Sequence, residues 1–179
     1  LREFVDPAHP RQLINVLEVE SNVLALNGDW AGAMAVLRRV RELARVHAFP
    51  PSQMWNIEVY EQRLALASGA HGPAREALLR LADGYPAGPR REFALVLADV
   101  AAAAQAEQDQ RRLPEPLVRA VMERARTYDW PGFAVHLAPL AARICSEALR
   151  RGIEPEFARR VVADRHLAPP TPHAPHWPW

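Results

Sequence analysis

The spacing of apolar residues predicts helices that are separated by Gly and Pro. Large apolar side chains recur every three or four positions from Leu13 to Leu24, and again from Val36 to Leu43. This spacing places them on one face of an α-helix. Gly28 suits the end of the first helix and Asp29 the start of the second. The sequence therefore predicts a helical hairpin, with its first helix running from about Pro10 to Gly28.

The same turn recurs 41 residues later. A glycine, an alanine and a leucine repeat at this offset: Gly28 with Gly69, Ala33 with Ala74, and Leu37 with Leu78. A period of this length is typical of stacked helical hairpins, because one hairpin cannot bury its apolar face alone. We therefore predict an all-α fold, a right-handed array of antiparallel helical hairpins. Proteins built from such arrays usually bind partners and relay signals, and they are rarely enzymes.

Proline and glycine mark the limits of the other helices. Ser52 is the expected cap of the second hairpin, which resumes near Pro73. Further helices are expected at about 90–107, 115–128, 138–151 and 155–167, with Pro139 in a first turn because an interior proline costs about 3 kcal/mol. Five prolines fall in the last twelve residues. We predict a helical repeat domain over 1–167, followed by an extended or disordered linker over 168–179 that leads to a further domain.

Composition and charge narrow the classes of partner. Hydrophobic residues make up 49% of the chain and only eight residues are Gly, which favours helix over sheet. The net charge is +1, from 22 basic and 21 acidic side chains, and every basic one is Arg. Because the net charge is so small, the chain has no strong positive electrostatic potential that would attract it to nucleic acid or to an anionic membrane. We expect neither direct nucleic-acid binding nor membrane association.

The single cysteine and the lack of targeting signals suggest a cytoplasmic protein. Cys145 cannot form an internal disulfide, and its apolar surroundings favour a buried, inert thiol over a nucleophile. No apolar run approaches the roughly 20 residues that span a bilayer, and the N-terminus lacks the pattern of a signal peptide. The chain begins without Met and ends abruptly at Trp179. We expect it to be a piece of a larger protein.

The first hairpin resembles a tetratricopeptide repeat. The residues that carry this resemblance are Gly28, Asp29, Trp30, Ala33, Leu37 and Val40. Glu20 departs from the signature, as do Glu58, Glu61 and Gln62 of the second repeat, which occupy core-type positions. The hairpins also exceed the usual length of about 34 residues. The resemblance implies an α-solenoid related to tetratricopeptide units rather than a consensus example.

The C-terminal third resembles a junction in large bacterial signal-transduction ATPases of the maltose-regulon-activator type. The matching segment is "PLAARICSEALRRGIEPEFARRVVADRHLAPP", followed closely by "WPW". In that family a nucleotide-binding region precedes helical repeats, and a Trp-Pro-Trp linker opens into a winged-helix DNA-binding domain. The resemblance implies a sensor or relay region of a transcriptional regulator. This chain has no Gly-rich phosphate loop and no Lys, so we expect no nucleotide cofactor here.

A polar stripe on the first helix is the candidate binding site. Asn15, Glu18 and Asn22 share one face, and the 41-residue offset places Asn56 and Arg63 at equivalent positions of the second repeat. These five residues would line a groove that hydrogen-bonds a small effector or an extended peptide. An ordinary solvated helix face explains the same pattern.

The tryptophans, the histidines and the acidic residues give weaker evidence for a functional site. Trp30, Trp55 and Trp130 could stack on a flat ligand, but such residues more often close the ends of hairpins. His166, His173 and His176 lack the fixed geometry of a metal site, so no metal is expected. No pair of acids or nucleophile–base pair stands out, which indicates a protein that is not an enzyme. A scaffold that binds a peptide or protein outside transcription is the alternative function.

Overall fold

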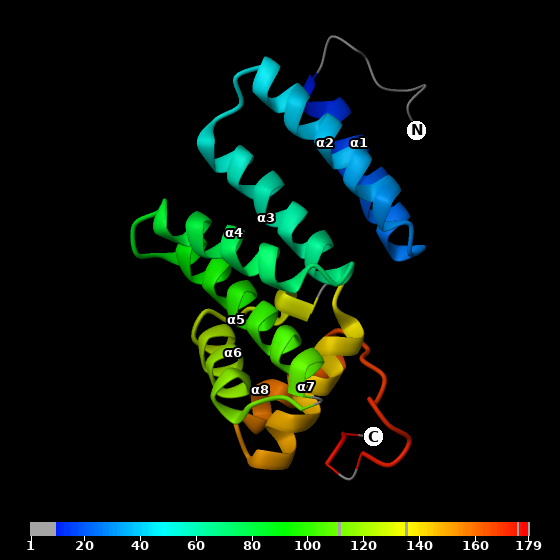
Figure 1. Ribbon diagram of the computed structural model, residues 1–179, viewed down its shortest axis with the longest axis vertical. Coiled ribbons are helices and arrows are strands. Elements are labelled where there is room, and N and C mark those ends of the chain that lie inside the picture. The colour runs from blue at the N-terminus through cyan, green and yellow to red at the C-terminus, as the bar shows by residue number, and fades with distance from the viewer. Residues whose placement is uncertain (1–9, 111, 135, 175, 179) are drawn as a thin grey trace. The chain divides into compact units, whose positions relative to one another are not determined.

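The computed structural model describes residues 10–110, 112–134, 136–174 and 176–178 (Figure 1). Within these ranges the chain forms eight α-helices and a short 3₁₀ turn, and no strand. The predicted all-α class is therefore confirmed. The chain divides into two compact units, Leu1–Ser68 and Gly69–Trp179. This division falls inside the predicted second hairpin, so the continuous stacking of repeats stays a prediction.

The first unit contains three helices. They are α1 (Pro10–Leu26), α2 (Trp30–Val46) and α3 (Pro51–Ala67). α1 and α2 run side by side in opposite directions, and α3 packs against α2 (Figure 1). The predicted first hairpin is thus present.

The turn between α1 and α2 has the predicted chemistry. Gly28 adopts φ +80°, in the left-handed region that favours glycine. The Asp29 carboxylate accepts a 2.8 Å hydrogen bond from the Gly32 backbone N–H, which caps α2. The Asp29 N–H in turn donates to the Leu24 carbonyl at 2.9 Å, so the end of α1 is also satisfied.

Apolar residues from all three helices form the core of the first unit. It includes Leu17 on α1, Leu37 on α2 and Leu64 on α3, each fully buried. Phe49, in the loop after α2, packs against the same cluster. This core holds α1 and α3 in place on either side of the candidate groove.

The start of α3 differs from the prediction. Ser52 lies inside the helix, which begins at Pro51 after Pro50, and no side chain caps it. Proline at a first helical position has no N–H to satisfy and its φ suits the helix, so the hydroxyl cap is dispensable. Further along α3, Glu61 is buried and forms an ion pair with Arg41 of α2.

The second unit contains the other five α-helices. They are α4 (His71–Asp83), α5 (Pro89–Gln110), α6 (Glu115–Thr127), α7 (Ala138–Arg151) and α8 (Pro155–Asp164), with the 3₁₀ turn η2 (Pro131–Ala134) before α7. α5 packs against both α4 and α6, and α7 packs against α8. The helix that starts at Pro155 ends at Asp164, before the expected limit near Leu167. Gly152 ends α7 in the left-handed conformation, which glycine adopts without steric cost.

Trp130 has the structural role that its position at a turn predicts. Its ring stacks on Tyr128 with centroids 4.8 Å apart and meets the Phe93 ring edge-on at 5.1 Å. Such aromatic pairs add to the stability gained by burial. The three rings tie the end of α6 to the start of α5.

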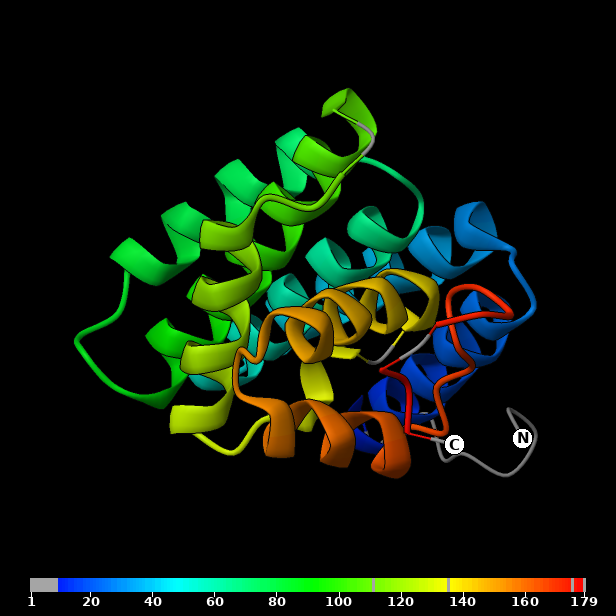
Figure 2. The ribbon, with the colours of Figure 1, turned by 90° about the horizontal axis from the view of Figure 1, so that it is seen from below.

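The chain after α8 forms turns and no helix or strand in the residues described, in keeping with its proline content (Figure 2, red). Two of its side chains are nevertheless buried, those of Ala174 and Trp177. The Trp177 N–H donates to the Ala174 carbonyl at 3.1 Å, and the Ala174 N–H donates to the Thr171 carbonyl at 3.3 Å. The segment therefore combines local turns with burial of its small and aromatic residues.

Candidate functional site

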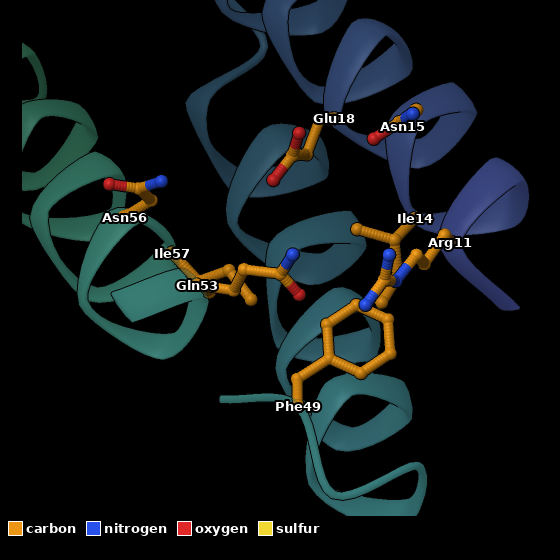
Figure 3. A pocket seen from close by; sticks show the side chains of 8 residues that line it. All are labelled: Arg11, Ile14, Asn15, Glu18, Phe49, Gln53, Asn56 and Ile57. Carbon is orange, nitrogen blue, oxygen red and sulfur yellow. The ribbon is translucent and has the colours of Figure 1, made fainter. Parts of the chain in front are cut away.

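A pocket of about 270 Å³ lies within the first unit, between α1 and α3 (Figure 3). Side chains of α1, α3 and the loop before α3 line it: Arg11, Ile14, Asn15, Glu18, Phe49, Gln53, Asn56 and Ile57. Three of these eight side chains are apolar and five are polar or charged. The pocket therefore joins an apolar floor to a polar wall.

Helical periodicity explains why these residues meet. Arg11, Asn15 and Glu18 are four and three positions apart, which places them on one face of α1. Gln53 and Asn56 are three positions apart on α3 and share a face in the same way. Phe49 closes one end of the pocket from the loop, and Figure 3 shows its ring beside Arg11.

The structure brings together three of the five candidate groove residues, namely Asn15, Glu18 and Asn56. Asn22 and Arg63 do not line the pocket. The Asn22 side chain instead donates a 2.9 Å hydrogen bond to the Glu18 backbone carbonyl, one turn back along α1. Arg63 lies seven residues beyond Asn56 on α3, two helical turns away.

Sequence reasoning missed Arg11, Gln53 and Phe49. Arg11 extends the α1 stripe by one turn, and Gln53 extends the α3 stripe in the same direction, so the helical period contained a signal for both. Phe49 lies in a loop, where no periodic pattern places its side chain. Its contribution required the three-dimensional structure.

The polar side chains of the pocket are not engaged with the protein. Among the residues that the structure describes, no hydrogen bond or ion pair forms at the side chains of Arg11, Asn15, Glu18, Gln53 and Asn56. The Gln53 side-chain oxygen is fully buried and has no partner there. Since buried polar atoms are nearly always hydrogen-bonded, an atom of this kind on a pocket wall suits a ligand.

The electrostatics of the pocket centre on Glu18. This carboxylate is half-buried, and burial raises its pKa above the ordinary value. A cation placed beside it would oppose this shift and stabilise the charged form. The site can therefore accept a positive group at Glu18 and hydrogen-bonding groups at the amides.

A second pocket, in the second unit, has different chemistry. Arginines of α7 surround it, but acidic side chains already pair with them. Arg150 and Arg151 both contact Glu147 at 2.8 Å, and Arg143 contacts Glu107 at 2.7 Å. These charges stabilise the helices of the second unit. Of these two pockets, the one between α1 and α3 is consequently the better candidate for a ligand.

The described residues offer neither a reactive thiol nor a cluster of metal ligands as a second candidate site. Cys145 is fully buried, as predicted, and burial raises the pKa of its thiol to about 12. Within the described residues, no three His, Cys, Asp or Glu side chains gather as metal ligands would. Nor does that part of the chain contain a helix with the length and apolar character needed to cross a membrane.

Comparison with known proteins gave no relative. No protein-family model, no curated protein and no solved structure matches this chain.

Proposed function

We propose that this chain is the sensor region of a bacterial transcriptional regulator, and that the pocket between α1 and α3 binds its effector or partner. The nucleotide-binding and DNA-binding parts lie outside the sequence described here, and the region works in the cytoplasm. The chain itself catalyses nothing in this proposal. It converts binding into a change in the packing of its helices.

One observation carries the binding role. Five polar side chains line the pocket next to an apolar floor, and the Gln53 amide oxygen among them is buried without a hydrogen-bond partner in the described residues. Specific ligand sites combine these two features, because apolar contact supplies affinity and a few polar groups fix orientation. A surface that is only solvated needs no buried, unpartnered amide oxygen such as that of Gln53.

The location of the pocket suits a relay. α1 and α3 are both packed against α2, and a ligand that contacts both would favour one spacing between them. A shift of this kind requires that the ligand bind one arrangement more tightly than the other. The change could then pass along the helices to the domains beyond them.

The regulator assignment rests on the resemblance of residues 114–179 to the junction before a winged helix. α7, the turn at Gly152 and α8 occupy the segment that carries this resemblance. The alternative is a tetratricopeptide-like scaffold that uses the same pocket for a peptide or protein outside transcription. The two functions share the binding site and differ in what the site controls.

The complete open reading frame separates these two functions. The proposal expects a nucleotide-binding region upstream of the chain and a winged-helix domain downstream of Trp179. A reading frame without a DNA-binding domain would favour the scaffold.

A reporter assay tests the pocket in the complete regulator. Simultaneous replacement of Asn15, Gln53 and Asn56 by Ala should abolish effector-dependent transcription without loss of helical content. Asn27→Ala removes an exposed amide outside the pocket and is the matched control. A triple variant that responds like the wild type would place the sensing site elsewhere.

A further inference from the structure

The pocket carries opposite charges at its two ends. Arg11 and Glu18 are on the same face of α1 and seven residues apart, which corresponds to about 10 Å along the helix. Neither side chain forms an ion pair with a described residue. Figure 3 shows Arg11 beside Phe49, whereas Glu18 lies farther along α1. The pocket thus offers a negative group and a positive group at a fixed spacing.

Amide side chains also line the pocket. Asn15 comes between Arg11 and Glu18 in the sequence of α1, while Gln53 and Asn56 belong to α3. Figure 3 shows the Gln53 side chain reaching from α3 toward α1, with its amide group between Glu18 and Phe49. Side-chain amides both donate and accept, so they match the alternating N–H and C=O groups of a peptide main chain.

The size of the pocket limits what enters it. Its volume of about 270 Å³ lies below the roughly 300–1,000 Å³ that is usual for drug-sized ligands. One long side chain fits this space, with the rest of the ligand lying along the surface. Ile14 and Ile57 also line the pocket, and their apolar surface suits the aliphatic stem of a Lys or Arg side chain.

We propose that the pocket binds an extended peptide segment in which a basic residue and an acidic residue are three positions apart. The basic side chain enters the pocket, packs its stem on Ile14 and Ile57, and pairs with Glu18. The acidic side chain pairs with Arg11 at the rim. In a polyproline II segment, residues three apart share one face and are about 9 Å apart, close to the spacing of the two charges on α1.

This inference rests on the proposed binding role of the pocket and adds the chemistry of its ligand. Charge complementarity distinguishes the segment from an uncharged peptide, which would leave Glu18 and Arg11 unpaired. It also distinguishes it from a purely acidic or purely basic segment, which would place a like charge beside one of the two.

Fluorescence anisotropy with the full chain, residues 1–179, tests the proposal. The probes are two fluorescein-labelled hexapeptides with blocked ends. One has aspartate followed three positions later by lysine, and the other has the reverse order; both have proline in the two positions between. One of the two probes should bind. Its affinity should fall about tenfold with Glu18→Gln and about tenfold with Arg11→Gln, as expected for the loss of one charge-assisted hydrogen bond.

Reversing the charge on both the probe and residue 18 tests the proposed ion pair directly. A probe with glutamate in place of lysine should bind poorly to the wild type and regain affinity with Glu18→Arg. Glu42→Gln and Arg39→Gln replace exposed charges of the same unit and should leave binding unchanged. Should a variant lose its helical circular dichroism, a probe with norleucine in place of lysine tests the Glu18 contact on the wild-type protein.

Three outcomes would overturn the peptide assignment. In the first, neither probe binds. In the second, the wild type and Glu18→Gln bind the probe equally well. In the third, the protein binds free lysine and not the peptides. If the triple pocket variant still abolishes the transcriptional response, the proposed function stands with another ligand. If that variant also responds normally, both proposals fail.

Discussion

The hydroxyl of Ser21 on α1 donates a 3.0 Å hydrogen bond to the backbone carbonyl of Ala33 on α2. Both residues are fully buried. A direct bond from a short side chain to the backbone of the neighbouring helix requires the two helices to approach closely. The small residue at position 33, which is repeated at Ala74, permits this approach.

Replacement of Ala33 by Leu should destabilise the first unit. The larger side chain has no space at this crossing and would push α1 away from α2, breaking the Ser21 hydrogen bond. We expect a loss of about 1–3 kcal/mol in the free energy of unfolding, measured by urea denaturation. Ala35→Leu, at an exposed position of the same helix, should change it by less than about 0.5 kcal/mol. Equal effects of the two substitutions would contradict the close crossing.

Helix positions could be predicted from sequence because their signals are local. The Gly28–Asp29 turn was predicted from one residue and its neighbours, and the structure contains it. Ser52 shows where such reasoning fails. Its hydroxyl suited a cap, but Pro51 already starts the helix one residue earlier. Two local signals competed, and the sequence alone did not rank them.

The candidate site could be predicted only in part, because its residues come from separate elements. The stripe on α1 was visible from its period, and the repeat offset suggested that Asn56 faces it. The offset failed to bring Arg63 into the pocket, since equivalent positions in two repeats need not line the same cavity. Phe49 and the unpartnered oxygen of Gln53 depend on how α3 packs, which is a tertiary property.

Arg124 should contribute more to stability than the surface arginines. It connects α6 to α5 through Glu92 at 2.6 Å and Asp99 at 3.1 Å, and burial raises the pKa of Asp99. Arg124→Ala leaves both acids without this partner, so we expect a loss of about 1–3 kcal/mol in unfolding free energy. Arg159→Ala removes an exposed pair with Glu156, and such pairs contribute about 0–1 kcal/mol. Similar losses in urea denaturation would show that Arg124 is only a surface charge.

The Cys145 thiol should be unreactive in the folded protein. It is fully buried, and its pKa of about 12 leaves very little thiolate at neutral pH. Ellman's reagent should therefore label one thiol rapidly in denaturant and almost none in the native state. Rapid labelling without denaturant would mean that α7 opens readily or that this thiol is accessible.

Glu61 should make stability fall as the pH rises through the acidic range. Burial is the main cause that raises its pKa, and Arg41 only partly opposes the shift. A raised pKa means that the folded state binds the proton more tightly than the unfolded state, whose glutamate pKa is about 4.3. The stabilisation from this proton is complete below that value and is lost as the pH rises through the folded pKa.

Glu61→Gln removes this titration. The free energy of unfolding of the variant should therefore increase relative to that of the wild type as the pH rises above the unfolded glutamate pKa of about 4.3. Glu147 provides a control of opposite sign, because hydrogen bonds from Arg150, with the nearby charge of Arg151, lower its pKa. Its contribution is present above the unfolded pKa and is lost as the pH falls. Urea denaturation from about pH 2 to pH 7 should therefore show two opposite trends with rising pH. Glu61→Gln gains on the wild type above the unfolded glutamate pKa, and Glu147→Gln loses on it below that value. Parallel curves for wild type and Glu61→Gln would show that the folded structure does not perturb Glu61.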